Sequence, residues 1–127
     1  MYGLEITLDL YGCDPKTFTR TGIKGWLEEL CRTIDMNRED LHFWDYQSMP
    51  KRQIPDDMDL AGTSAVQFLT ASNITIHTLD LLGECYINIF TRNATFNIKA
   101  MADFTGSWFK AKNYECRMME RGKESKA

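Results

Sequence analysis

Two serines and a histidine stand in a segment that otherwise has the composition of buried β-strands. Ser64, Ser72 and His77 are separated by eight and five residues, among β-branched and aromatic side chains that alternate with period two over residues 63–92. Buried hydroxyl and imidazole groups cost free energy unless they find partners. A hydroxyl together with an imidazole, which titrates near neutral pH, can carry proton-transfer chemistry. Hydrogen bonds to neighbouring backbone are the alternative, and on spacing alone the simpler interpretation.

The rest of the chain predicts the elements that would hold this segment. Leu4 to Leu10 alternates as a half-buried strand does, and apolar residues at helical spacing predict a helix from about Thr17 or Thr21 to Met36. Further strands are predicted at Leu41–Tyr46, Ser64–Thr70, Asn73–Leu79, Glu84–Thr91 and Tyr114–Met119, a loop at Ser48–Asp59 and a second helix at Thr95–Phe109. This order predicts an α+β fold, a two-layer sandwich with both helices packed on one face of an antiparallel sheet.

Composition limits the classes of protein that the chain can belong to. Its 127 residues suit a single domain over 1–127, and a net charge of −3 argues against binding nucleic acid. No run of about 18 apolar residues is present, so no membrane span is expected. The four cysteines are Cys13, Cys31, Cys85 and Cys116. They lie far apart without a CxxC pair, which predicts reduced thiols in a cytoplasmic protein and no metal site.

The segment resembles the processing site of the prokaryotic S-adenosylmethionine decarboxylases, small enzymes that make their own pyruvoyl cofactor. The matching stretches are Ser64-Ala65-Val66, Ala71-Ser72-Asn73, Ile74-Thr75-Ile76-His77-Thr78 and Asn88-Ile89-Phe90-Thr91-Arg92. Residues 3–14 also look like the opening strand of that family, so the resemblance covers nearly the whole chain. It implies the fold of the family and a homodimer with its sites at the subunit interface.

The resemblance also implies a role for each polar residue. The hydroxyl of Ser72 would attack the carbonyl of Ala71, and elimination would cut the chain between them, leaving a pyruvoyl group derived from Ser72. This carbonyl cofactor forms a Schiff base with the amine of the substrate and serves as an electron sink. Ser64 would donate a hydrogen bond to the oxyanion at the scissile carbonyl, and His77 would remove the Cα proton.

Two positions differ from the family pattern. Ala71 stands where the family usually has glutamate, and Arg92 stands where it has the cysteine that reprotonates the decarboxylated carbon. A guanidinium does not release a proton near neutral pH. Cys85 lies on the same strand, but an offset of seven residues puts its side chain on the other face of the sheet.

Two further residues are candidates for binding the substrate. Asp80 lies one position before the place where the family has an acid that contacts the substrate ribose; alternatively, it is a turn residue. Arg92 is either a bidentate ligand of a substrate carboxylate or a surface residue at a strand end.

Three functions follow from these observations. The first is a pyruvoyl-dependent decarboxylase of S-adenosylmethionine, a step of polyamine (spermidine) biosynthesis. The second is a pyruvoyl decarboxylase re-tuned for another amino acid, such as arginine or ornithine. The third is a divergent homologue that never processes and binds a ligand or a partner subunit without catalysis.

Overall fold

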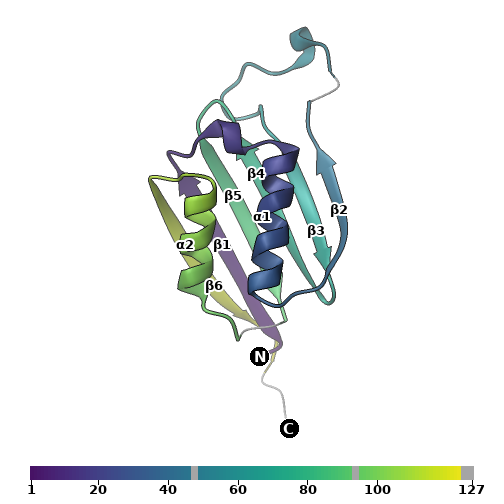
Figure 1. Cartoon of the computed structure of the whole chain (residues 1–127), viewed down its shortest axis with the longest axis vertical. Coiled ribbons are helices and arrows are strands. Elements are labelled where there is room, and N and C mark those ends of the chain that lie inside the picture. Colours follow the sequence, from purple (N-terminus) through teal and green to yellow (C-terminus); the bar gives the residue numbers. More distant parts are fainter. Residues whose placement is uncertain (47–48, 93–94, 124–127) are drawn as a thin grey trace.

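The computed structural model describes residues 1–46, 49–92 and 95–123. Its strands form one antiparallel six-stranded sheet in the order β2-β3-β4-β5-β1-β6. The elements are β1 (Gly3–Tyr11), η1 (Pro15–Thr17), α1 (Arg20–Thr33), β2 (Arg38–Trp44), η2 (Lys51–Gln53), β3 (Ser64–Leu69), β4 (Ser72–Leu79), β5 (Glu84–Thr91), α2 (Ile98–Trp108) and β6 (Asn113–Arg121). Both helices lie on the same face of the sheet (Figure 1). The predicted α+β two-layer architecture is confirmed.

The hydrophobic core lies between the two helices and the sheet. Alternate residues of the strands point into this core, as Leu4, Ile6, Leu8 and Leu10 of β1 do. One side of α1 faces these residues with Ile23, Trp26, Leu27 and Leu30. Trp26 is fully buried, and its indole N–H donates to the hydroxyl of Thr105 in α2 at 3.0 Å. This contact joins the two helices. The face of the sheet that the helices leave uncovered carries the polar positions of the strands and is hereafter called the open face.

Helix α1 is shorter than predicted at its C-terminus. It ends at Thr33 rather than Met36, because Asp35 adopts the left-handed conformation with φ of 56°. The amide of Met36 then donates to the carbonyl of Cys31 at 2.8 Å, the closing bond of a Schellman motif. At the other end, the hydroxyl of Thr19 accepts from the amide of Gly22 at 3.0 Å and caps the helix.

Strand β2 begins three residues earlier than predicted and ends at Trp44, not Tyr46. The charged residues at its start show no apolar alternation, and the register shifts between Arg38 and Leu41. The buried amide of Gln67 in β3 donates to two main-chain carbonyls in this irregular stretch, which explains how the strand is held without apolar residues.

The other boundaries differ by a few residues. β4 begins at Ser72 rather than Asn73, and α2 begins at Ile98 because Asn97 caps it. β6 is longer than predicted at both ends, since it pairs with β1 from Gly3 to Tyr11. Ser48 of the predicted loop is outside the described residues.

The sheet has two ends that matter for the site. At the end where α1 begins, residues 49–60 project beyond the sheet as an arm that contains η2 (Figure 1). At the opposite end lie the β3–β4 hairpin at Thr70 and Ala71, the α1–β2 turn and the last residue of β5. These are hereafter the arm end and the hairpin end.

Candidate active site

Ser64 and His77 form a hydrogen-bonded pair on the open face, near the arm end. They are directly opposed on the antiparallel strands β3 and β4, and Ser64 Oγ lies 2.6 Å from His77 Nδ1. Their neighbours Ala65 and Ile76 are 3% and 1% exposed on the face that the helices cover. A hydroxyl and an imidazole at this distance can exchange a proton, which is the chemistry expected of a base and its partner.

Two aromatic residues flank the pair in the same row across the sheet. Trp44 is the partner of Ser64 on β2, and Tyr86 is the partner of His77 on β5. Trp44 is 57% exposed, which is unusual for so large an apolar group. A hydrogen bond to the carboxylate of Glu84 raises the pKa of Tyr86 to about 12, so its phenol stays neutral.

Ser72 lies at the hairpin end. The residue is 9% exposed, and its Oγ accepts a hydrogen bond from the backbone N–H of Arg92 at 3.0 Å. The preceding Ala71 has φ of 61°, a left-handed conformation that costs a residue with a Cβ roughly 1–2 kcal/mol. The expected scissile bond therefore follows a strained residue. It borders a pocket of about 380 Å³, lined by Asp35, Met36, Asn37, Thr70, Ala71, Ser72 and Arg92.

Within one chain, Ser72 is far from the Ser64–His77 pair. Ser72 and His77 are five residues apart on one extended strand, about 16 Å at 3.3 Å per residue. The odd separation also puts them on opposite faces: Ser72 shares the buried side with Ile74 and Ile76, whereas His77 is exposed on the open face. Of the three residues singled out from the sequence, the fold brings two together and places the third elsewhere.

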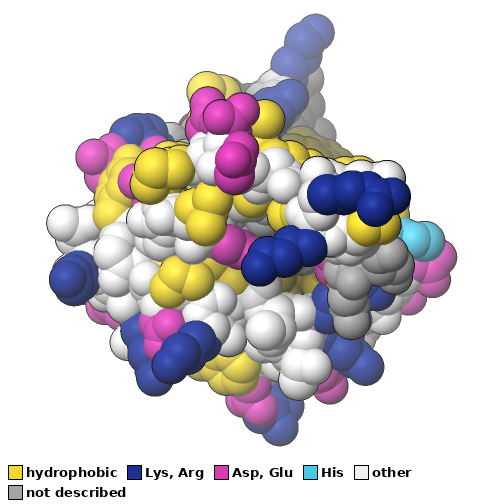
Figure 2. Space-filling view, turned by 90° about the horizontal axis from the view of Figure 1, so that it is seen from above, with side chains coloured by type: hydrophobic (Ala, Val, Ile, Leu, Met, Phe, Trp, Pro, Cys, Tyr) yellow, Lys and Arg dark blue, Asp and Glu magenta, His cyan; other side chains and the backbone are white. Residues whose placement is uncertain are grey.

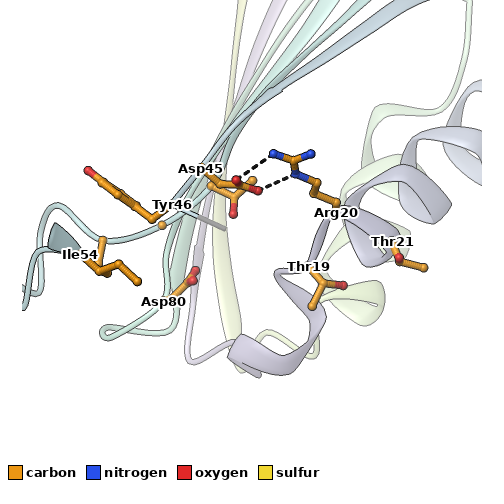
Figure 3. A pocket seen from close by; sticks show the side chains of 10 residues that line it. Thr19, Arg20, Thr21, Asp45, Tyr46, Ile54 and Asp80 are labelled. Carbon is orange, nitrogen blue, oxygen red and sulfur yellow. Dashed lines mark hydrogen bonds and ion pairs between the residues drawn. The ribbon is translucent and has the colours of Figure 1, made fainter. Parts of the chain in front are cut away.

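Asp80 also lies apart from the pair, in a cleft of about 710 Å³ at the arm end. Figure 3 shows Asp80 and Tyr46 across this cleft from the ion pair of Arg20 with Asp45, in which Nε and Nη2 donate at 2.7 and 2.8 Å. Burial raises the pKa of the Asp80 carboxyl, although the hydroxyl of Thr78 donates to it at 2.9 Å. The cleft therefore holds a carboxylate that is only partly solvated.

The surface of the arm end carries exposed apolar side chains. Figure 2 looks onto this end and shows hydrophobic side chains lying among acidic and basic ones. Large apolar residues that are at least 38% exposed occur in the arm and in the β4–β5 turn: Met49, Ile54, Met58, Leu60, Leu81 and Leu82.

Cys85 lies on the face of β5 that the helices cover. Cys85 is fully buried among the core residues, and a hydrogen bond with Cys13, together with burial, raises its pKa. Such a thiol does not release a proton readily, and it cannot reach the pocket of Ser72. Over residues 1–46, 49–92 and 95–123, no group of three acidic, histidine or cysteine side chains suits a metal ion, and no helix is both long and apolar enough to cross a bilayer.

Sequence reasoning missed one part of the hairpin end. Asp35 and Asn37, in the α1–β2 turn, line the same pocket as Ser72 although they lie 35 or more residues away in sequence. The polar run after the helix indicates a turn, but no local pattern says which strand end the turn meets.

The fold and the site define a two-layer α+β domain with helices on one face of an antiparallel sheet and a Ser–His pair on the other. A family model described as S-adenosylmethionine decarboxylase matches residues 4–122, and the chain belongs to this family. The crystal structure of the adenosylmethionine decarboxylase from Aquifex aeolicus VF5 has a similar fold, with a TM-score of 0.77. That protein is 22% identical, and the match covers 99% of this chain and 95% of the other. No curated protein sequence matched the chain.

Proposed function

We propose that this protein is a pyruvoyl-dependent decarboxylase that cleaves itself between Ala71 and Ser72. One observation carries the proposal: the hydroxyl of Ser72 accepts the Arg92 N–H at 3.0 Å, directly after a residue with φ of 61°. An N–H donor on a serine oxygen favours the alkoxide character that the oxygen gains as it loses its proton. The nucleophile and the strain are thus at the same peptide bond.

Self-cleavage proceeds in steps that involve only protein groups and water. The Ser72 oxygen attacks the carbonyl carbon of Ala71, the C–N bond breaks, and the amide becomes an ester with a free amine on residue 72. Removal of the Cα proton of residue 72 by His77 then expels the carboxylate of Ala71. Water replaces the resulting enamine nitrogen as ammonia, and a pyruvoyl group remains at the new N-terminus. Ser64 is assigned to hydrogen-bond the oxyanion formed in the first step.

The geometry supports an active unit of two copies. The Ser64–His77 pair of one chain lies at the opposite end and on the opposite face from its own Ser72. The helices cover one face of the sheet, so the open faces are the surfaces with which two copies can meet. A two-fold axis crossing β4 near Ile74 and Thr75 brings the exposed hairpin residue Ala71 of each chain, and with it the Ala71–Ser72 peptide bond, to the arm end of the other. We therefore propose a homodimer with shared sites.

The residues present fit a pyruvoyl group at position 72. Ser72 is the first residue of β4, so a cut before it leaves the new end held by the β4–β5 ladder and facing the pocket. A pyruvoyl group supplies a carbonyl that accepts electron density from the α-carbon of an amino acid as CO₂ leaves. Arg92 cannot reprotonate that carbon, so the acid must be water or a group of the second copy. The proposed substrate is S-adenosylmethionine, which would place the reaction in polyamine synthesis, or another amino acid.

Intact mass under denaturing conditions tests the proposal. The purified chain of 14.7 kDa is expected to appear as two fragments, one ending at Ala71 and one blocked by a pyruvoyl group. Carbon dioxide release from S-adenosylmethionine, arginine and ornithine then identifies the substrate. A wild-type chain that stays full-length after long incubation contradicts the proposal, and in that case Ser72→Ala will behave like the wild type.

One observation favours a second candidate, a homologue that never processes. The family's proton-donor cysteine is replaced by Arg92, and a chain that does not react has no need of that acid. Binding of a ligand or of a related subunit without catalysis would then be its function, and the intact-mass experiment separates the two candidates.

A further inference from the structure

Arg92 brings to the pocket of Ser72 a positive charge that no carboxylate of the described residues pairs. Its backbone N–H donates a hydrogen bond to Ser72 Oγ, and Arg92 is one of the residues that line the same pocket as Thr70, Ala71 and Ser72. Within the described part of the chain, the guanidinium makes no hydrogen bond or ion pair. By contrast, five other arginines each pair with a carboxylate: Arg20, Arg32, Arg38, Arg117 and Arg121. No described residue therefore engages the guanidinium donors of Arg92.

The chemistry of decarboxylation decides which group of a substrate a guanidinium can usefully bind. A carboxylate that leaves as CO₂ loses its charge in the transition state. An arginine bound to it stabilises the substrate more than the transition state, and this slows the reaction. A carboxylate elsewhere in the substrate keeps its charge throughout the reaction, so an arginine bound to it does not slow decarboxylation. The same cation repels a sulfonium or ammonium group in the side chain of a substrate bound in this pocket.

We propose that Arg92 makes this pocket selective for an α-amino acid with a second, side-chain carboxylate. The inference rests on the proposed function, because the amino acid is assigned to the carbonyl formed at position 72. A planar guanidinium can hold such a carboxylate through two parallel hydrogen bonds. Thr70 and Asn37 border the same pocket and supply further polar groups.

Among the described residues that line the pocket, Asp35 is the acidic one, and its carboxylate would favour a cationic ligand. It lies in the exposed α1–β2 turn, and no ion pair joins it to Arg92 among the described residues. A cationic side chain such as that of ornithine would select Asp35 instead. Arg92 is the charge whose backbone contacts Ser72 directly, so it is assigned the greater influence on the ligand.

Binding to the uncleaved variant Ser72→Ala tests this inference apart from self-cleavage. The probes are L-aspartate and L-glutamate against L-asparagine and L-glutamine, which differ from them only in the second carboxylate. Titration calorimetry should show each acid binding roughly 10- to 100-fold more tightly than its amide. Adding Arg92→Gln should abolish the difference, and Arg92→Lys should restore part of it. Arg52→Gln is the matched control, because Arg52 is exposed on the arm and remote from the pocket.

Two outcomes overturn the proposal. One is equal binding of acid and amide in the presence of Arg92. The other is tighter binding of L-ornithine, L-arginine or S-adenosylmethionine than of either acid, which would make Asp35 the selective group. In the wild-type chain, CO₂ release from aspartate or glutamate is the expected counterpart. If no cleavage occurs, the proposed function fails, while the binding comparison still decides the role of Arg92.

Discussion

Ser64 Oγ and His77 Nδ1 lie 2.6 Å apart because the two residues face each other directly across the β3–β4 ladder. The two residues are thirteen positions apart along the hairpin, and the register alone sets their contact. The same register places Ser72 at the hairpin end, so the side chains of His77 and Ser72 in a single chain lie on opposite faces of the sheet.

The Ser64–His77 pair predicts the effect of removing the base. His77→Gln keeps a hydrogen-bonding side chain but cannot accept the Cα proton, so self-cleavage should slow by about 10²–10⁴-fold. Ser64→Ala should slow it by about 10²–10³-fold. Gel electrophoresis of the fragments against time measures both rates. His42→Gln, on the open face of β2, is the matched control, and an equal loss in that variant would contradict a specific role for His77.

The separation of Ser72 from His77 predicts complementation between two inactive chains. When tagged Ser72→Ala and His77→Gln chains are co-expressed, mixed pairs contain one site with both groups intact. The His77→Gln chain should then be cleaved, while the Ser72→Ala chain stays full-length, as intact mass will show. No cleavage in the mixture, with mixed pairs recovered by the two tags, would mean that each chain uses its own histidine.

Burial of Asp80 predicts a pH-dependent stability. Because burial raises the carboxyl pKa above 3.8, the folded chain binds this proton more tightly than the unfolded chain. Stability from this group is present below the unfolded pKa and is lost as the pH rises through the folded pKa. Asp80→Asn should therefore gain stability relative to the wild type over that window, measured by urea unfolding at several pH values. Asp59→Asn, an exposed change of the same charge, should show no such trend.

The contact between the helices predicts a large effect of a near-isosteric change. Thr105→Val leaves the buried indole N–H of Trp26 without an acceptor, which should lower the free energy of unfolding by about 1–3 kcal/mol. Denaturant unfolding of the uncleaved chain measures the change. Thr33→Val, at an exposed position of α1, should change it by less than about 0.5 kcal/mol. Similar values for both variants would show that the Trp26 contact contributes little.

The strands and helices could be predicted where periodicity was strong. The alternation of Leu4, Ile6, Leu8 and Leu10 identified β1, and the helical spacing of Trp26 and its neighbours identified α1. Prediction was wrong where local geometry overrode the pattern. Asp35 ended α1 early by adopting a left-handed conformation, and the charged start of β2 is held by Gln67 rather than by apolar burial.

Residue types and spacing by themselves determined the layers of this protein, its family and the residues whose side chains could carry out chemistry. This was possible because alternation and helical period are local properties of a chain. Only the tertiary structure decided which of those residues meet. Strand register and the period of two joined Ser64 to His77, turned Ser72 to the other face and brought Arg92 and Asp35 to the same pocket. These relationships depend on contacts between distant segments, which a linear pattern does not contain.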